Sequence, residues 1–242
     1  ITPYDDQIEK VKFAPEYQQK SEKQETYPLA PKIIVRRLKS KKLSFNLLSE
    51  EEISSLLWYT CKHGHFNLFV ETLSYFKGDI NAFINCNYST LLLEAAYYGQ
   101  LQVLCHLLDH GADIDGRVEQ GNTALLLACA RGHMDIVQEL VKRGARLDIK
   151  NNNGHTAMVE AAGAGHLDIV RHLISKGGLN SVQLGEFQVT ALSLAAFNGE
   201  LKMVQFLLEL YGEIYALEEL FYALIEASIN GHIEVICALV EC

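Results

Sequence analysis

The chain of 242 residues has little of what an enzyme or a membrane protein would need. It contains no Gly-x-x-x-x-Gly-Lys phosphate loop and no Gly-x-Ser-x-Gly turn around a nucleophilic serine. No stretch of eighteen or more residues is free of charge, so the sequence predicts no membrane span. No charged-then-apolar leader follows Ile1, so no signal peptide is visible. We therefore expect neither catalysis nor membrane insertion.

The cysteines and histidines lack the spacing of disulfide or metal frameworks. Six cysteines stand at irregular positions without a Cys-x-x-Cys pair, and we interpret Cys61 and Cys129 as buried, reduced thiols. This favours the cytoplasm or the nucleus. His106 and His110 share the i, i+4 spacing of a possible metal site. The leucines beside them should occupy the buried face of the same predicted helix. We therefore expect both histidines in solvent and no metal or cofactor.

Charge is unevenly distributed along the chain. Residues 1–50 contain ten Lys and Arg against seven Asp and Glu, a net charge of +3. Residues 51–242 contain eleven against twenty-three, a net charge of −12. So acidic a body disfavours nucleic acid as a direct ligand and favours basic or neutral partners.

The first part of the chain differs from the rest in composition. All four prolines lie within residues 1–31, which have no sustained apolar period. We expect residues 1–48 to form an extended, partly basic arm. Segment 32–42 has an apolar triplet beside six basic residues, and is interpreted as a short strand or an arm lying on the acidic body. A nuclear-import signal or a partner-docking patch is the alternative.

A repeated unit of about 33 residues fills the remainder. Its turn glycines lie at 64, 99, 132, 165, 199 and 231, and histidine follows four of them. A threonine stands nine residues before four of these glycines. Each unit is predicted to form a helix, a tight turn, a second helix and a loop led by glycine. The predicted units cover residues 50–84, 85–117, 118–150, 151–183, 184–216 and 217–242, within an array over 49–242.

Stacking of neighbours must make the core, because one unit cannot bury its own apolar face. In the third unit Leu125, Ala128 and Cys129 share one helix face, and the second helix buries Ile136 and Leu140 at the same spacing. Left-handed ends are expected after the second helices, at Gly111, Gly144 and Gly177. The apolar face of 233–239 shows no polar replacement, so further repeats or another domain are expected after Cys242.

These residues resemble the ankyrin repeat, whose pattern is Gly-x-Thr-Pro-Leu-His-x-Ala-Ala-x-x-Gly-His followed by a leucine-rich helix. The resemblance covers residues 50–242 and implies an all-α ankyrin-repeat solenoid. Alanine or leucine replaces the proline after threonine. Leu-Glu-Ala-Ala (93–96) alternates with Leu-Leu-Ala-Cys (126–129), which is similar to the Mask family (multiple ankyrin repeats with a single KH domain). No KH Gly-x-x-Gly unit is recognisable, so only the adaptor role is implied.

The family resemblance implies binding on the hairpin tips and on the concave face of the first helices. Helical spacing then predicts the residues that face a partner. We expect three glutamates to be accessible there, unless each pairs with a nearby cation such as Arg131 and is structural. The aromatics are predicted interface anchors, or else shield the seams between repeats. The candidates are Tyr59, Glu94, Tyr97, Tyr98, Arg131, Glu160, Phe197, Asn198 and Glu226 on the helices, and Arg117, Arg146 and Lys150 at the tips.

The sequence thus predicts a scaffold or adaptor for protein–protein interactions. Its partner would be a protein or an extended peptide with basic and apolar residues. One alternative is a substrate-receptor or regulatory subunit of an enzyme complex such as a ubiquitin ligase. Another is the cytoplasmic array of a larger channel or of a bacterial effector.

Overall fold

The computed structural model describes residues 31–40, 43–82, 89–177, 190–211 and 217–241, and these residues form helices and loops without a strand. The elements are α2 (Pro31–Lys39), η3 (Phe45–Leu47), α3 (Glu50–Lys62), α4 (Phe66–Leu73), α5 (Leu91–Tyr97), α6 (Leu101–Asp109), α7 (Ala124–Arg131), α8 (Met134–Lys142), α9 (Ala157–Gly163), α10 (Leu167–Ser175), α11 (Ala191–Asn198), α12 (Leu201–Tyr211), α13 (Leu217–Ile229) and α14 (Ile233–Val240).

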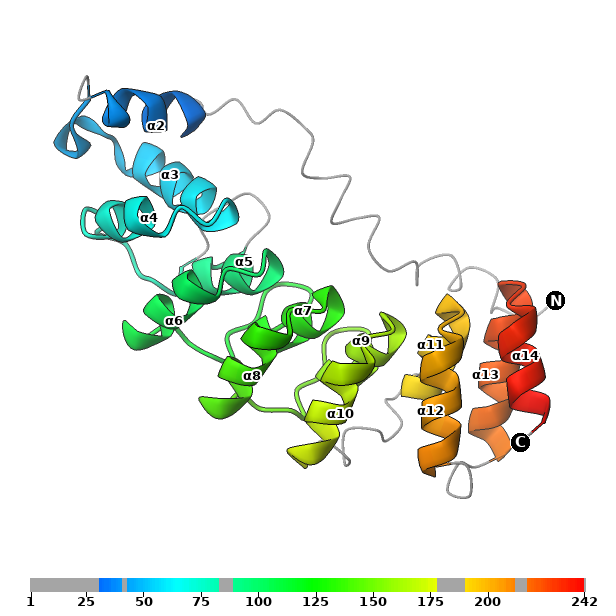
Figure 1. Ribbon diagram of the computed structural model, residues 1–242. Coiled ribbons are helices and arrows are strands. Elements are labelled where there is room, and N and C mark those ends of the chain that lie inside the picture. The colour runs from blue at the N-terminus through cyan, green and yellow to red at the C-terminus, as the bar shows by residue number, and fades with distance from the viewer. Residues whose placement is uncertain (1–30, 41–42, 83–88, 178–189, 212–216, 242) are drawn as a thin grey trace.

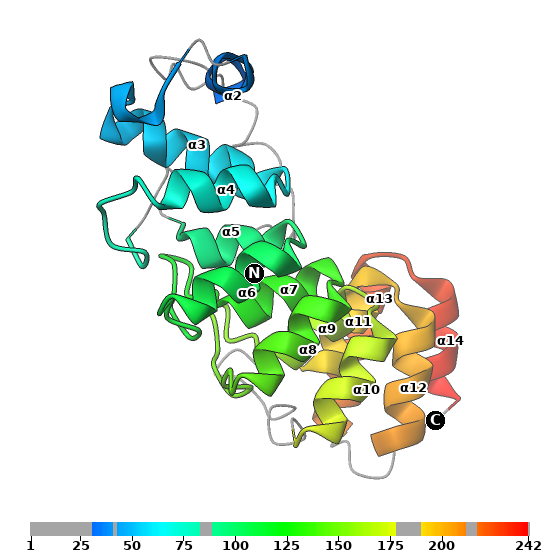
Figure 2. The ribbon, with the colours of Figure 1, turned by 60° about the vertical axis from the view of Figure 1, so that its left-hand side comes forward.

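From α3 onward the helices alternate between two layers of a curved array. From α3 to α10, the first helix of each unit lies on the inner side of the curve and the second helix on the outer side (Figure 1). In the last two units α11 packs against α9 and α13, and α12 packs against α14, so the two layers continue. The turned view shows the same pairs stacked one after another (Figure 2). Helix α9, for example, packs between α7 and α11 in the inner layer. The predicted all-α solenoid is confirmed.

Side-chain caps begin the first helices of the first five units, α3, α5, α7, α9 and α11. The hydroxyl oxygens of Thr90, Thr123, Thr156 and Thr190 each accept a hydrogen bond from the backbone N–H three residues later. These caps satisfy donors that the helix itself cannot pair. Ser49 caps α3 in the same way, and the Glu52 side chain bonds back to the Ser49 N–H. Ser49 and Glu52 thus form a capping box at the start of α3.

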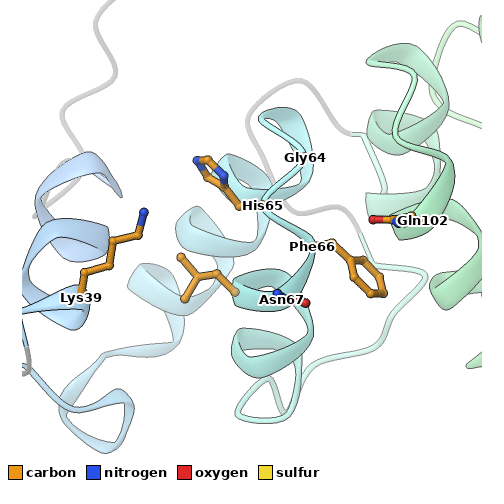
Figure 3. Close-up of a pocket in the computed structure, with 7 residues that line it drawn as sticks. Lys39, Gly64, His65, Phe66, Asn67 and Gln102 are labelled. Carbon is orange, nitrogen blue, oxygen red and sulfur yellow. The ribbon is translucent and has the colours of Figure 1, made fainter.

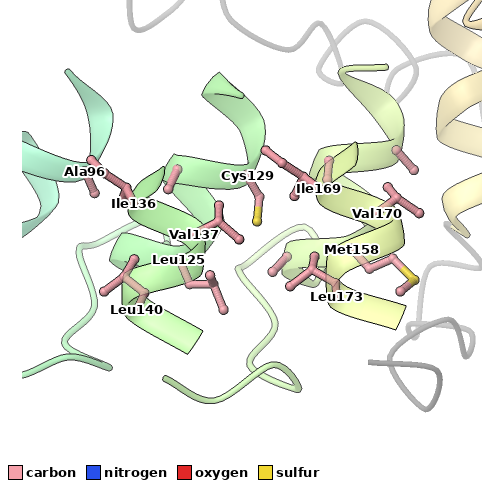
Figure 4. Packing of buried hydrophobic residues seen from close by; sticks show 14 of the residues in the cluster. Ala96, Leu125, Cys129, Ile136, Val137, Leu140, Met158, Ile169, Val170 and Leu173 are labelled. Atoms are coloured by element: carbon pink, nitrogen blue, oxygen red, sulfur yellow. The ribbon is translucent and has the colours of Figure 1, made fainter. Parts of the chain in front are cut away.

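The core runs continuously through the stack. Figure 4 shows side chains of α7 and α8, among them Leu125, Cys129 and Ile136, packed beside Met158 and Ile169 of the next unit. Each of the five is at most 2% exposed. Apolar burial contributes about 25 cal/mol per Å², so contacts between units, rather than any unit alone, hold the array together.

The expectation of an extended arm is wrong for residues 31–39, which form helix α2. Ile34 is fully buried and Val35 is 8% exposed, because both pack against Phe45 and Leu56 at the start of the array. Two residues of the apolar triplet, Ile34 and Val35, therefore form the buried stripe of an amphipathic helix, and Ile33 stays exposed. Residues 43–48 of the predicted arm include the short helix η3, and residues 1–30 and 41–42 lie outside the described residues.

The repeated glycine and histidine join successive units. The turn glycine has a positive φ, +76° at Gly132 for example, where a side chain is strained. The ring of His133 lies over Gly99 of the preceding unit, and its Nε2 is 3.1 Å from the Tyr97 carbonyl oxygen. In the last unit His232 Nε2 lies 2.9 Å from the Phe197 carbonyl oxygen. At both positions the imidazole is therefore within hydrogen-bond distance of the backbone of the preceding unit.

Candidate partner-binding surface

The inner helices bring aromatic and cationic side chains together in the first three units. The Arg131 guanidinium lies 3.8 Å from the centroid of the Tyr97 ring. Tyr97 and Tyr98 meet edge to face, with centroids 4.9 Å apart. The Lys62 ammonium lies 4.9 Å from the centroid of Trp58 and 5.1 Å from that of Tyr98. All five side chains are partly exposed, and we call them the inner aromatic strip.

Trp58 and Lys62 were not among the predicted site residues. Trp58 is the only tryptophan of the chain. It stands four residues before Lys62, a spacing that puts both on one helix face. That spacing, together with the rarity of tryptophan, is the signal in the sequence that identifies them.

The expected exposure of Glu94 is wrong. Its side chain is 8% exposed, and its Oε2 accepts a hydrogen bond from the indole Nε1–H of Trp58 at 3.1 Å. Burial, with the neighbouring Glu94 carboxylate as second cause, raises the pKa of Tyr98 to about 12. Glu94 therefore lies beneath the inner aromatic strip and orients its tryptophan.

Glu160 is likewise buried, at 4% exposure, although it was predicted to face a partner. Asn151 Nδ2 donates to Glu160 Oε1 at 2.8 Å, and His155 Nδ1 lies 3.3 Å from the same oxygen. His155 and Asn151 are themselves buried in the loop before α9. A buried carboxylate requires such partners, so this glutamate joins the loop to its helix.

Glu226 is the most accessible of the three glutamates. It is half-buried on α13, and burial raises the pKa of its carboxyl group. Of the remaining predicted residues, Tyr59 and Phe197 are half-buried and Asn198 is exposed. Asn198 Nδ2 donates to the Gly163 carbonyl oxygen at 2.8 Å, which joins α11 to α9.

The predicted hairpin-tip residues Arg117, Arg146 and Lys150 are all exposed. Arg146 forms an ion pair with Asp148 at 3.0 Å, and its backbone N–H donates to the Asp115 carboxylate at 3.1 Å. The tips of the second and third units are thus joined to each other, away from the inner aromatic strip.

Outside the strip, the sequence also singles out a pair of histidines and two cysteines among the described titratable side chains. His106 is half-buried rather than in solvent, and its ring lies beside those of Phe66 and His110. Within the described ranges no group of three or more His, Cys, Asp or Glu is placed to hold a metal ion. Cys61 and Cys129 are buried and free, and burial raises the pKa of each thiol. The prediction that both cysteines are buried is confirmed.

Residues 92–183 match the family model described as ankyrin repeats (3 copies). These residues are ankyrin repeats. The same turn glycines and stacked helix pairs continue on both sides of the match, at Gly64, Gly199 and Gly231. The ankyrin resemblance is thereby confirmed, whereas the narrower likeness to the Mask arrays stays a prediction.

No curated protein shows detectable sequence similarity to the chain. Ankyrin repeats bind partner proteins and are generally not enzymes, so the chain contains a protein-interaction module. None of the described helices has both the length and the apolar character needed to cross a membrane.

Proposed function

We propose that this ankyrin array is a scaffold or adaptor that binds a partner protein or extended peptide along the inner side of its curve. The observation that supports this most directly is the inner aromatic strip. Partly exposed Trp and Tyr rings beside Lys and Arg are the side chains that most often dominate binding energies at interfaces. A rigid helical layer presents them at little entropic cost.

The partner we propose has apolar side chains for the rings and basic residues elsewhere. The net charge of −12 over residues 51–242 supports basic residues in the partner. Glu94 and Glu160 do not contribute to this argument, because both are buried. The half-exposed Glu226 and the acidic body remain available to such a partner. The free, buried thiols of Cys61 and Cys129 favour a reducing compartment, the cytoplasm or the nucleus.

The test replaces Tyr98 and Arg131 with Ala together. Loss of a central anchor costs about 2 kcal/mol or more, so capture of partners from an extract of the source cells should fall at least tenfold. The control is the pair Phe206→Ala and Arg171→Ala. That pair has a similar ring–cation contact, 4.5 Å between Arg171 and the Phe206 centroid, on the outer helices.

Trp58 gives a second measurement, because it is the only tryptophan of the chain and therefore the source of all its tryptophan fluorescence. A captured partner without tryptophan should change the emission of Trp58 on titration. Equal capture by the inner and outer double variants, at unchanged melting temperature, would place the binding surface elsewhere. The hairpin tips around Arg146 are then the next surface to test.

A further inference from the structure

The start of the array leaves one side of its second helix uncovered. Four residues after the turn glycine, the second to sixth units have an apolar side chain that is at most 2% exposed. These residues are Val103, Ile136, Ile169, Met203 and Val235. The first unit has Leu68 there, and it is only half-buried. Helix α2 packs on α3 in place of a complete preceding unit, so a hollow remains between α2 and α4.

His65, the histidine of this first turn, lacks within the described chain the contact with a backbone carbonyl oxygen that the corresponding histidines of two later units make. His133 and His232 lie within hydrogen-bond distance of a carbonyl oxygen of the preceding unit. Among the described residues only α2 and η3 precede the unit of His65, and this histidine is exposed and makes no side-chain hydrogen bond to any of them. Its ring lies beside those of Tyr59 and His63 instead.

The hollow is open, measures about 720 Å³ and combines cationic, apolar and amide groups (Figure 3). Lys39 approaches from α2 and His65 from the turn. Phe66 and Leu68 provide apolar surface, and Asn67 and Gln102 provide amides. None of the residues that line it is acidic.

Further positive charge surrounds this hollow. Lys32, Arg36 and Arg37 are exposed on α2, and none forms an ion pair with a described residue. The pKa of His63 is lowered, first by burial and then by Lys62, His65 and Lys32. Lys62, His65 and Lys32 therefore all lie near the ring of His63. The glutamates of α3 lie in its first turn, at the opposite end of that helix from Lys62.

We propose that this hollow docks a short acidic segment of a partner protein. A carboxylate forms an ion pair with Lys39 and accepts a hydrogen bond from the His65 ring, and an adjacent apolar side chain packs on Phe66 and Leu68. The apolar surface favours a peptide over a nucleic acid, which would have only phosphates and bases to place there. The acidic remainder of the array repels a long polyanion, so the segment is short. This surface goes beyond the proposed binding to the inner aromatic strip and does not depend on it.

The experiment uses the full chain and a short fluorescein-labelled peptide in which leucines alternate with pairs of glutamates. Binding is followed by fluorescence anisotropy at ~50 and ~300 mM salt, since screening weakens exposed charge contacts. Saturable binding is expected, and Lys39→Glu with His65→Glu should weaken it about tenfold or more. The matched control is Lys202→Glu with Gln205→Glu. It makes the same charge change at two exposed positions of α12 and should leave binding unchanged. Equal melting curves establish that both variants fold.

Hydrogen exchange should slow in residues 62–68 on peptide addition and not in α12. The Tyr98→Ala variant should bind the peptide as the unaltered chain does, which separates this site from the proposed function. Three results would overturn the proposal: no saturable binding, equal weakening by both charge pairs, or polyuridylate binding as tightly as the peptide. Self-association that Lys39→Glu abolishes would also overturn it, because the occupant would then be a second copy of the chain.

Discussion

The surroundings of a single glutamate determine its role in this array. Glu94, Glu160 and Glu226 occupy one position of the repeat, yet their neighbours differ. Glu94 accepts a bond from Trp58, and Glu160 bonds to Asn151 in the loop before its own helix. Glu226 is half-buried, and burial raises the pKa of its carboxyl group. A repeated residue therefore need not have a repeated function.

Replacing Glu160 with Ala should destabilise the array by about 1–3 kcal/mol, because Asn151 and His155 lose a shared acceptor in a buried site. Urea unfolding measures the loss. Glu226→Ala, at the same position of the sixth unit, should cost less than about 1 kcal/mol, since a half-exposed group is resolvated by water. If both substitutions cost the same, the buried network around Glu160 contributes nothing of its own.

At the scale of elements, α2 shows how a solenoid can protect its first unit. An array exposes an apolar face where it begins, and a covering element must be polar on its outer side. Helix α2 satisfies both needs, because Ile34 and Val35 face the array and four basic residues face outward. Because α2 is one helix and not a helix pair, it covers α3 and leaves one side of α4 uncovered.

Two adjacent isoleucines test this capping role. Ile34 is fully buried and Ile33 is 45% exposed. Ile34→Ala should therefore cost about 2–4 kcal/mol, and Ile33→Ala well under about 1 kcal/mol. The measurement is urea unfolding, together with hydrogen exchange in α3, which should accelerate only in Ile34→Ala. Equal effects of the two substitutions would show that α2 does not cap the first unit.

Across the whole molecule, the side chain after the turn glycine connects successive units. His133 lies over Gly99, His166 over Gly132 and His232 over Gly199. Gln100 takes this role in the second unit, where its amide donates to the Lys62 and Tyr98 carbonyl oxygens. In the fifth unit Glu200 lies over Gly165, so the same contact recurs along the array with an imidazole, an amide or a carboxylate.

This recurrence predicts a dependence of stability on pH. The pKa of His133 is lowered, mainly by burial and also by Arg131, although Asp135 acts in the opposite direction. The folded state then binds fewer protons than the unfolded state. The contribution of His133 to the free energy of unfolding is present above pH ~6.5 and is lost as the pH falls below that value.

The His133→Gln variant copies the natural arrangement at Gln100 and removes the titrating group. The free energy of unfolding of the unaltered chain should fall more between pH 7.5 and 5.5 than that of this variant. Urea midpoints at the two pH values give the comparison. A larger fall in the variant would contradict the assigned sign.

The repeated units, their register, the turn glycines and the buried faces could all be predicted from the order of the residues. Each of these follows from the period of one helix pair, as the confirmed faces around Leu125 and Ile136 show. The burial of Glu94 and Glu160, the position of α2 and the hollow beside Leu68 could be seen only in the folded chain. Periodicity fixes the direction in which a side chain leaves its own helix. Whether Trp58, a loop asparagine or solvent meets it there depends on contacts between segments distant along the chain.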